Sequence, residues 1–266
     1  MQGFLAFHGL AVLACGWAPG RWMTWLGLLL AAHGVVMALV LQPRNRWFGA
    51  NLTRLPPENV QRGEVAITFD DGPDPVVTPQ VLDLLDQYTA KASFFVVGRR
   101  VQQHPELARH ILVRGHRLEN HSSHHHALFS LLSTERMARE IMALQDCLVA
   151  LPGPPPGYFR PPAGFHSPLL VPLLRSLGLH LATWTRRGFD TRVSDTQRVL
   201  RRLTRHLAAG DILLLHDGNA ARDASGQAVV LRVLPLLLSE LQRRGLRAVA
   251  LPSPDALRGS TTRPQA

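Results

Sequence analysis

Short apolar segments alternate with longer amphipathic segments over most of the chain, from about residue 64 onwards. The segments expected to be strands are Val65–Phe69, Ala92–Val97, His116–Glu119, Tyr158–Arg160, Leu179–Trp184, Ile212–Leu215 and Arg247–Leu251. The segments expected to be helices are Pro79–Tyr88, Pro105–Arg114, Thr134–Ala150, Ser167–Leu177, Thr196–Ala208 and Val229–Arg244. In such an alternation the helices connect parallel strands across the outside of a sheet. The pattern therefore predicts an α/β domain with a parallel sheet that is either open or closed as a barrel.

An uncharged apolar run from Trp22 to Leu41 precedes this domain. A helix of that length rises about 30 Å, which is the hydrocarbon thickness of a bilayer. A second apolar run, Gly3 to Ala18, comes before it and ends at Pro19-Gly20-Arg21. Residues 1–43 are therefore expected to form a membrane anchor, either one transmembrane helix or a helical hairpin. A cleaved signal peptide is disfavoured because the runs lack a basic leading segment and a small-residue cleavage motif.

After the predicted anchor about 220 residues remain, which suffices for one α/β domain without disulfides. We expect a linker over residues 44–63, a catalytic domain over 64–252 and a disordered tail over 253–266. The net charge of +10 is spread along the chain without a basic block or interleaved aromatic residues, so nucleic-acid binding is not expected. An anionic surface such as phospholipid headgroups or a phosphorylated lipid suits this charge, and a purely solubilising role explains it equally well.

Two adjacent carboxylates, Asp70 and Asp71, end the first expected strand, and Gly72-Pro73-Asp74-Pro75 prevents that strand from continuing. Side chains of neighbouring strand residues point to opposite faces, whereas a turn at the strand end lets both face one cleft. Two close carboxylates ionise together only beside a cation. The pair therefore suits a metal ligand next to a general base, although an Asx turn that closes a strand also explains it.

A histidine-rich segment, Asn120 to His126, follows another expected strand. His121 and His125 are four residues apart, so one helical turn would place both imidazoles on one face. Together with Asp71 they form a set of two histidines and one carboxylate, which is typical of an open site for zinc or a related divalent ion. The alternative is a polar surface cluster, which the carboxylates upstream and His216 downstream disfavour.

Further polar residues stand at or just beyond expected strand ends, namely Arg160, Asp190 and the pair His216-Asp217. In parallel α/β architectures the active site lies at the carboxyl ends of the strands. These residues are therefore expected to gather with the carboxylate pair and the histidines at one edge of the sheet.

Four segments in this order resemble the polysaccharide deacetylases, the NodB-like carbohydrate esterases. They are Thr68–Pro73, Asn120–His125, Arg160–Gly164 and Leu214–Asp217, and the resemblance covers residues 64 to 251. It implies a distorted (β/α) barrel of about seven strands rather than a full (β/α)₈ barrel. It also implies removal of N-acetyl groups from sugars with a divalent metal, Zn²⁺ before Co²⁺, Ni²⁺ or Mn²⁺.

Matched position by position, the resemblance implies a role for each polar residue of these segments. Asp71, His121 and His125 would hold the metal. Asp70 would act as general base and His216 as general acid, which supplies the proton that a leaving amine needs. Arg160 would pair with Asp70 and keep it ionised. The residues implied to contact the substrate are Ala163 through its backbone N–H, Leu214 beside the acyl methyl group, and Trp184.

One segment departs from the family pattern of Trp, Asp, and a second Asp followed by Trp. Here residues 184–191 read Trp-Thr-Arg-Arg-Gly-Phe-Asp-Thr, so Arg187 replaces the carboxylate that tunes the catalytic histidine, and Asp190 is the surviving Asp. We therefore expect Asp190 or Asp217 to contact His216 in its place. Arg187 is then available for an anionic group of the substrate, such as a sugar phosphate on a lipid carrier.

The sequence thus predicts a metal-dependent sugar N-deacetylase of the bacterial inner membrane that acts on envelope polysaccharide or a lipid-linked glycan. Two alternatives stay open: a deformylase of an undecaprenyl-phosphate-linked amino sugar, and a non-catalytic glycan-binding protein on the same fold. The side of the membrane stays open too. Arg44, Arg46 and Arg54 follow the anchor, which favours a cytoplasmic domain, whereas the family resemblance favours the outer face.

Overall fold

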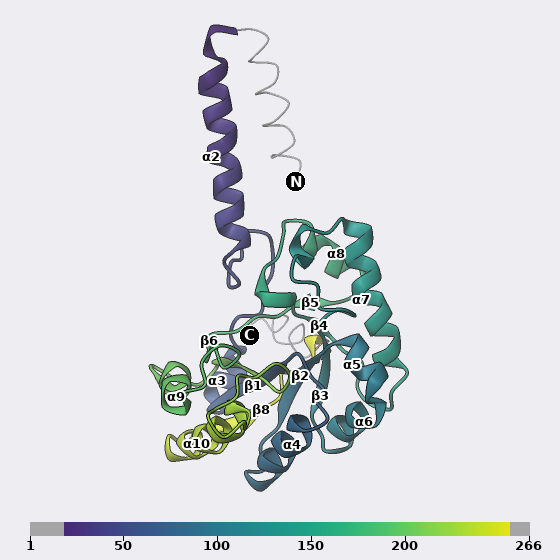
Figure 1. The fold of residues 1–266 in the computed structure, drawn as a ribbon, viewed down its shortest axis with the longest axis vertical. Coiled ribbons are helices and arrows are strands. Elements are labelled where there is room, and N and C mark those ends of the chain that lie inside the picture. Colours follow the sequence, from purple (N-terminus) through teal and green to yellow (C-terminus); the bar gives the residue numbers. More distant parts are fainter. Residues whose placement is uncertain (1–18, 256–266) are drawn as a thin grey trace, which may run out of the picture.

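The computed structural model describes residues 19–255, in which helices surround a central parallel sheet (Figure 1). The strands are β1 (Glu64–Asp70), β2 (Ala92–Val96), β3 (Arg117–Asn120), β4 (Tyr158–Phe159), β5 (His180–Leu181), β6 (Arg186–Arg187), β7 (Ile212–His216) and β8 (Arg247–Val249). The apolar run expected at Gly3–Ala18 and residues 256–266 of the expected tail lie outside the described residues.

The strands pair in the order β5-β4-β3-β2-β1-β7-β6, and β8 pairs with β1 beside this path. Every pairing between these strands is parallel. The expected distorted (β/α) barrel of about seven strands is confirmed. The strand expected at Leu179–Trp184 is shorter than the pattern suggested, because regular pairing stops at Leu181, and β6 was not expected.

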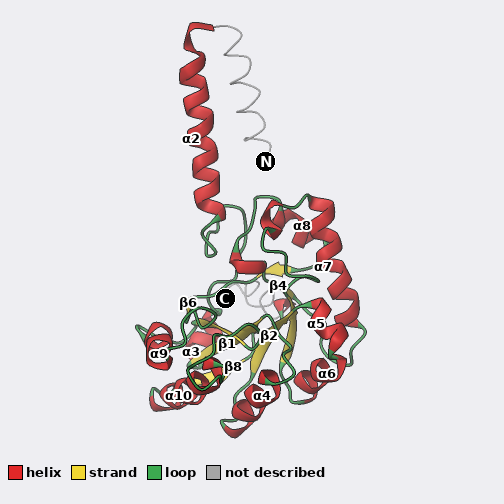
Figure 2. Cartoon of the chain, in the orientation of Figure 1, coloured by secondary structure: helices red, strands yellow, loops and turns green. Residues whose placement is uncertain are grey.

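All the expected helices form, and most pack on the outside of the sheet (Figure 2). The helices are α2 (Trp22–Val40), α3 (Pro57–Gln61), α4 (Val77–Gln87), α5 (Gly98–Gln103), α6 (Pro105–Val113), α7 (Thr134–Val149), α8 (Leu170–Ser176), α9 (Thr196–Thr204) and α10 (Val229–Arg243). Short 3₁₀ turns are η1 (Pro19–Arg21), η2 (Phe129–Leu131) and η3 (Pro162–Gly164).

Successive side chains of the central strands alternate between two apolar clusters, one on the outer face of the sheet and one inside the barrel. Val65, Ile67 and Phe69 of β1 belong to a large apolar cluster that includes side chains of α4 and α10. Ala66 of the same strand belongs to a separate cluster with Ile212 and other inward-facing residues. Counted in steps of two from Ala66 and Ile212, the inward-facing positions end at Asp70 on β1 and at His216 on β7. The two-residue period of the strands therefore places both polar side chains on the inner face of the sheet, at the carboxyl ends of the strands.

The segment between the apolar helix and β1 spans the opening between the two sides of the sheet. Leu52 pairs with Ala182 just after β5, and Arg54 pairs with Asp211 just before β7. The Leu52 N–H donates to the Leu181 carbonyl at 2.9 Å, and the Leu55 N–H donates to the Gly210 carbonyl at 2.8 Å. Leu55 is buried in the inner cluster. The expected linker, residues 44–63, is therefore packed and hydrogen-bonded against the domain.

Helix α2 stands away from the domain (Figure 1) and is long and apolar enough to cross a membrane. It has 19 residues with a mean hydropathy of 2.0, and only Val40 at its end is buried. Large apolar side chains such as Met23 and Leu30 are 70% and 63% exposed. A helix that is apolar all round is stable only in apolar surroundings. The structure therefore contains one candidate membrane span within residues 19–255.

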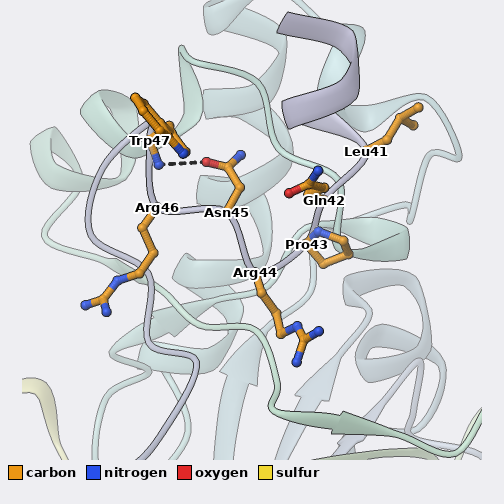
Figure 3. Close-up of a pocket in the computed structure, with 7 residues that line it drawn as sticks. All are labelled: Leu41, Gln42, Pro43, Arg44, Asn45, Arg46 and Trp47. Carbon is orange, nitrogen blue, oxygen red and sulfur yellow. Dashed lines mark hydrogen bonds between the residues drawn. The ribbon is translucent and has the colours of Figure 1, made fainter. Parts of the chain in front are cut away.

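The loop Leu41–Trp47 connects α2 to the domain (Figure 3) and is fixed by two buried asparagines, Asn45 within the loop and Asn51 after it. The Asn45 side chain donates to the Leu39 carbonyl at 2.8 Å, and its Oδ1 accepts from the Trp47 N–H at 2.8 Å. The Asn51 side chain donates to the carbonyls of Pro43 and Asn45 at 2.9 and 3.1 Å. Its Oδ1 accepts from the Thr183 hydroxyl at 3.0 Å. Asn51 therefore joins the anchor loop to the interior of the domain.

Replacing Asn51 with alanine is expected to loosen this loop, because the carbonyls of Pro43 and Asn45 and the Thr183 hydroxyl lose their partner. The free energy of unfolding should fall by about 1–3 kcal/mol, and hydrogen exchange should accelerate at residues 43–51. Urea unfolding and exchange mass spectrometry of the detergent-solubilised chain measure both effects. Gln42→Ala, an exposed substitution in the same loop, is the control. Equal exchange in the two variants would contradict the role assigned to Asn51.

Candidate active site

The polar residues identified from the sequence gather at the carboxyl ends of the strands. Asp70 ends β1 and lies opposite His216, the last residue of β7, in the parallel register. His121 follows β3, and Arg160 follows β4. Asp71 has a φ of 74°, a left-handed conformation that aspartate tolerates. This turn brings the second carboxylate to the same side as the first, as expected for a pair released from the strand.

Asp71, His121 and His125 form a convergent set of donor atoms. Asp71 Oδ1 lies 3.3 Å from His121 Nε2 and 3.1 Å from His125 Nε2. Burial disfavours the ionised form of Asp71, but the two imidazoles outweigh this and hold its pKa well below the usual range. Oδ1 is buried, and no donor within residues 19–255 completes a hydrogen bond to it. One unsatisfied carboxylate oxygen facing two imidazole nitrogens fits a divalent transition metal.

The tautomer of His121 is set by its other ring nitrogen. Nδ1 lies 2.7 Å from the backbone carbonyl of Arg160, and a carbonyl only accepts, so Nδ1 carries the proton. Nε2 is then the ring nitrogen that faces Asp71 Oδ1. A hydrogen bond from the distal nitrogen is the usual support of a metal-binding histidine. The buried position of His121 and this bond therefore favour a ligand role.

The segment that carries His125 is a loop, so the two histidines do not meet by the helical turn that their spacing suggested. Ser122 and His125 both have positive φ, 66° and 54°, which reverses the chain between them. Glu140 of α7 holds this loop: its Oε2 accepts from the His124 N–H at 2.9 Å, and its backbone carbonyl accepts from the Ser123 N–H at 3.0 Å. Glu140 was not identified from the sequence, because nothing local links it to residues 123–124.

Asp70 is held by a fully buried guanidinium. Arg160 Nη1 donates to Asp70 Oδ1 at 2.5 Å and to the Thr68 hydroxyl at 3.0 Å. The second oxygen of Asp70, Oδ2, lies 3.8 Å from His121 Nε2 and faces the convergent donor set. Burial lowers the pKa of Arg160, but Asp70 opposes that shift and the guanidinium keeps its charge. Asp70 therefore has one oxygen fixed by a cation and one directed towards the centre of the site.

His216 is paired with Asp190, one of the two partners that the sequence left open. His216 Nδ1 lies 2.8 Å from Asp190 Oδ1, and the His216 backbone N–H donates to Asp190 Oδ2 at 2.8 Å. Burial is the largest single influence and lowers the pKa of this imidazole, but the charge and hydrogen bond of Asp190, together with the charges of Asp70 and Asp71, raise it by more, and the net shift is upwards. The arrangement keeps His216 protonated to higher pH than a free histidine, as a general acid requires.

The side chain of Asp217 contacts Thr78 and not His216. Its Oδ2 accepts from the Thr78 hydroxyl at 2.5 Å, and burial raises its pKa to about 7. Gly72 lies against this carboxylate: a Cβ at that position would come within 2.1 Å of Asp217 Oδ2.

Asn219, which the sequence analysis missed, donates to Asp71 Oδ2 at 3.2 Å. Only its position, two residues after the His216-Asp217 pair, pointed to it.

A pocket of about 280 Å³ opens above these groups. All four residues expected to contact a substrate line it: Ala163, Trp184, Arg187 and Leu214. Ala163 has a φ of 58° in the turn η3, and Leu214 faces the pocket from β7. Thr191 and Arg192 line it as well, although the sequence did not identify them. The pocket therefore joins an imidazole, a carboxylate, a candidate metal centre and an apolar wall.

Comparisons with known proteins agree with this geometry. A family model described as polysaccharide deacetylase matches residues 58–182. The chain is 35% identical over 189 residues to a peptidoglycan-N-acetylglucosamine deacetylase of Bacillus cereus, covering 70% of this chain and 85% of that protein. It is 32% identical over 194 residues to a chitooligosaccharide deacetylase of Bradyrhizobium, covering 71% and 89%. The structure of the peptidoglycan deacetylase PdaC from Bacillus subtilis matches with a TM-score of 0.64 at 27% identity, covering 75% and 91%.

Replacing His121 with alanine is expected to remove a bound divalent metal, because one of three convergent donors is lost. Elemental analysis of the purified chain after incubation with Zn²⁺ and desalting measures this directly. All variants carry His124→Ala as a common background, which removes one donor of a second, more exposed group formed by His124, His126 and Glu140. His110→Ala is the control, since His110 is exposed on α6 and belongs to neither group. Metal retained by His121→Ala, or lost from His110→Ala, would show that the ligands are assigned wrongly.

Proposed function

The chain belongs to the polysaccharide deacetylase family, and from that membership we propose a metal-dependent hydrolase that removes the N-acetyl group from an amino sugar. The proposed substrate is an envelope polysaccharide or a lipid-linked glycan. The proposed location is the bacterial inner membrane, with α2 as the anchor. Both named relatives are deacetylases of N-acetylated glycans, which favours acetyl over the formyl group of the alternative proposed from the sequence.

One observation carries the proposal: a carboxylate paired with a buried cation and an imidazole paired with a buried carboxylate end adjacent strands and face one pocket. Asp70 lies against the buried guanidinium of Arg160. His216, its register neighbour, lies against Asp190, and its pKa is raised. A base and an acid poised on two sides of one pocket suit amide hydrolysis, in which water loses a proton and the amine gains one. The non-catalytic alternative gives no reason for this arrangement.

The proposed mechanism assigns each proton to an atom of the chain. A divalent metal held by Asp71, His121 and His125 would polarise the amide carbonyl and acidify a water molecule. Asp70 removes the proton of the attacking water through Oδ2, because Oδ1 is engaged by Arg160. His216 donates its Nε2 proton to the nitrogen of the departing amine, while Asp190 orients the ring through Nδ1. The Ala163 N–H donates to the developing oxyanion, and Leu214 contacts the acetyl methyl group.

Asp70→Asn is expected to keep the metal and lose turnover, because the change removes the base but none of the three proposed ligands. The rate of acetate release from an N-acetylated glycan oligomer should fall by about 10²–10⁴-fold. Asp146→Asn, which changes an exposed carboxylate on α7, is the control and should retain full activity. If Asp70→Asn lost its metal, Asp70 would be a ligand, and the base would have to be sought elsewhere.

Asp190→Asn is expected to move the alkaline limb of the pH–rate profile to lower pH. Asp190 raises the pKa of His216 against the effect of burial, so its removal lowers that pKa and deprotonates the acid sooner as pH rises. Asp217→Asn should leave this limb in place, because Asp217 bonds to Thr78 instead. A shift of the limb by Asp217→Asn alone would reverse the assignment of the two carboxylates.

A further inference from the structure

A second cavity of about 520 Å³ adjoins the catalytic pocket on the side of the membrane helix. We call it the vestibule. Four residues line both spaces: Ala163, Trp184, Arg187 and Arg192. The far wall of the vestibule is formed by Leu41, Pro43 and Arg44, directly after α2. The vestibule therefore leads from the catalytic groups to the end of the candidate membrane span.

The charges of the vestibule differ from those of the catalytic pocket. Arg44, Arg187 and Arg192 line it, and none of the described residues that line it is acidic. Within residues 19–255 these three arginines form no ion pair, whereas several other arginines of the domain, such as Arg160 and Arg186, pair with buried carboxylates. The charges of Asp70, Asp190 and Asp71 act on Arg187 from the catalytic pocket, but no carboxylate lines the vestibule itself. An anion in the vestibule would therefore meet three guanidinium groups without an ion-pair partner, and the composition of the vestibule suits an anion.

Arg187 is the most constrained of the three. Its guanidinium lies 5.3 Å from the Trp184 ring centroid and 5.0 Å from that of Phe189, so two aromatic faces fix its plane. Its Nε is buried and has no hydrogen-bond partner among the described residues. A buried donor without an acceptor costs about 1–3 kcal/mol, and an oxyanion in the vestibule would satisfy it. Guanidinium groups bind phosphate oxygens with matched geometry.

The anchor loop supplies the third arginine. Arg44 and Arg46 extend in different directions from this loop (Figure 3), and only Arg44 lines the vestibule. Arg44 Nη1 donates to the Thr185 carbonyl at 3.2 Å, which directs its guanidinium towards β6. Because Arg44 lies four residues after the end of α2, a group bound between it and Arg187 lies at the membrane surface.

We propose that the vestibule binds the phosphate of a lipid-linked substrate, an N-acylated amino sugar joined through phosphate to a membrane lipid. The sugar would occupy the catalytic pocket, the phosphate would lie among Arg44, Arg187 and Arg192, and the lipid would run beside the exposed apolar side chains of α2. This inference rests on the proposed deacetylase activity and chooses between the two substrate classes left open there. A membrane phospholipid headgroup offers the same phosphate chemistry, so the experiment must separate the two sources.

The test compares two soluble substrates that differ only in phosphate: a short-chain alkyl phosphate ester of N-acetylglucosamine and the matching alkyl glycoside. The full chain, loaded with Zn²⁺ in a nonionic detergent, should show a kcat/KM at least about tenfold higher for the phosphate ester, a difference of about 1.4 kcal/mol. Arg187→Gln and Arg192→Gln should each reduce kcat/KM for the phosphate ester several-fold more than kcat/KM for the glycoside, so that the preference falls. High salt should reduce the preference in the same way.

Arg44→Gln and Arg46→Gln form a matched pair within one loop. Arg44→Gln should weaken the preference for the phosphate ester, and Arg46→Gln should not. Equal kcat/KM for both substrates in the wild type, or an equal loss on both substrates in the arginine variants, would overturn the assignment. Anionic phospholipid in nanodiscs should not abolish the preference. If it does, the vestibule binds headgroups rather than substrate, and the assignment also fails.

The same design separates failure of this inference from failure of the proposed function. Hydrolysis of both substrates without preference would leave the deacetylase proposal intact and remove the phosphate site. If neither substrate is hydrolysed, titration calorimetry with the phosphate ester decides: tight binding that weakens in Arg187→Gln supports the vestibule and removes the deacetylase proposal. A lack of binding in the wild type removes the vestibule as well.

Discussion

The buried ion pair between Arg160 and Asp70 is the contact on which the rest of the site depends. A fully buried guanidinium is stable only when its charge and its donors are satisfied. Arg160 meets this demand with the Asp70 carboxylate, the Thr68 hydroxyl and the backbone carbonyls of Ala182 and Thr183. Its guanidinium also lies 3.9 Å from the Phe95 ring centroid. One side chain therefore connects β1, β2 and the segment after β5, and its own carbonyl sets the tautomer of His121.

The sequence predicted those parts of the fold and site that depend on local pattern. The alternation of apolar and amphipathic segments predicted the parallel sheet, and the polar residues after each segment predicted where the site lies. The strand β6 was missed because Arg186 and Arg187 carry no apolar signal; their pairing with Leu213 and Leu214 exists only in the assembled sheet. Asn219 and Glu140 were missed for the same reason, since each acts on a residue brought near by the fold.

The choice between Asp190 and Asp217 shows how strand geometry resolves what composition leaves open. His216 is the last residue of β7, so the side chain of the next residue points to the opposite face. Asp217 is accordingly directed to Thr78, while Asp190, in the loop after β6, reaches His216 at the end of the neighbouring strand β7. Phe189, with a φ of 60°, turns the chain so that Asp190 returns to the imidazole. The carboxylate partner is thus retained although Arg187 occupies the position where the family pattern places it.

The same contacts connect α2, the candidate membrane span, to the proposed catalytic groups. Asn51 bonds the Pro43 carbonyl on one side and the Thr183 hydroxyl on the other, and the Thr183 carbonyl accepts from Arg160 Nη2 at 2.8 Å. Arg160 in turn holds Asp70. An unbroken series of hydrogen bonds therefore runs from the anchor loop to the proposed base, and the pocket has one orientation relative to the end of α2. A domain joined to an apolar helix by a flexible linker would sample a wide volume, whereas this packing confines the pocket to the region next to the end of α2. The proposed lipid-linked substrate, held beside α2, matches that confinement better than a glycan deep in a polymer layer.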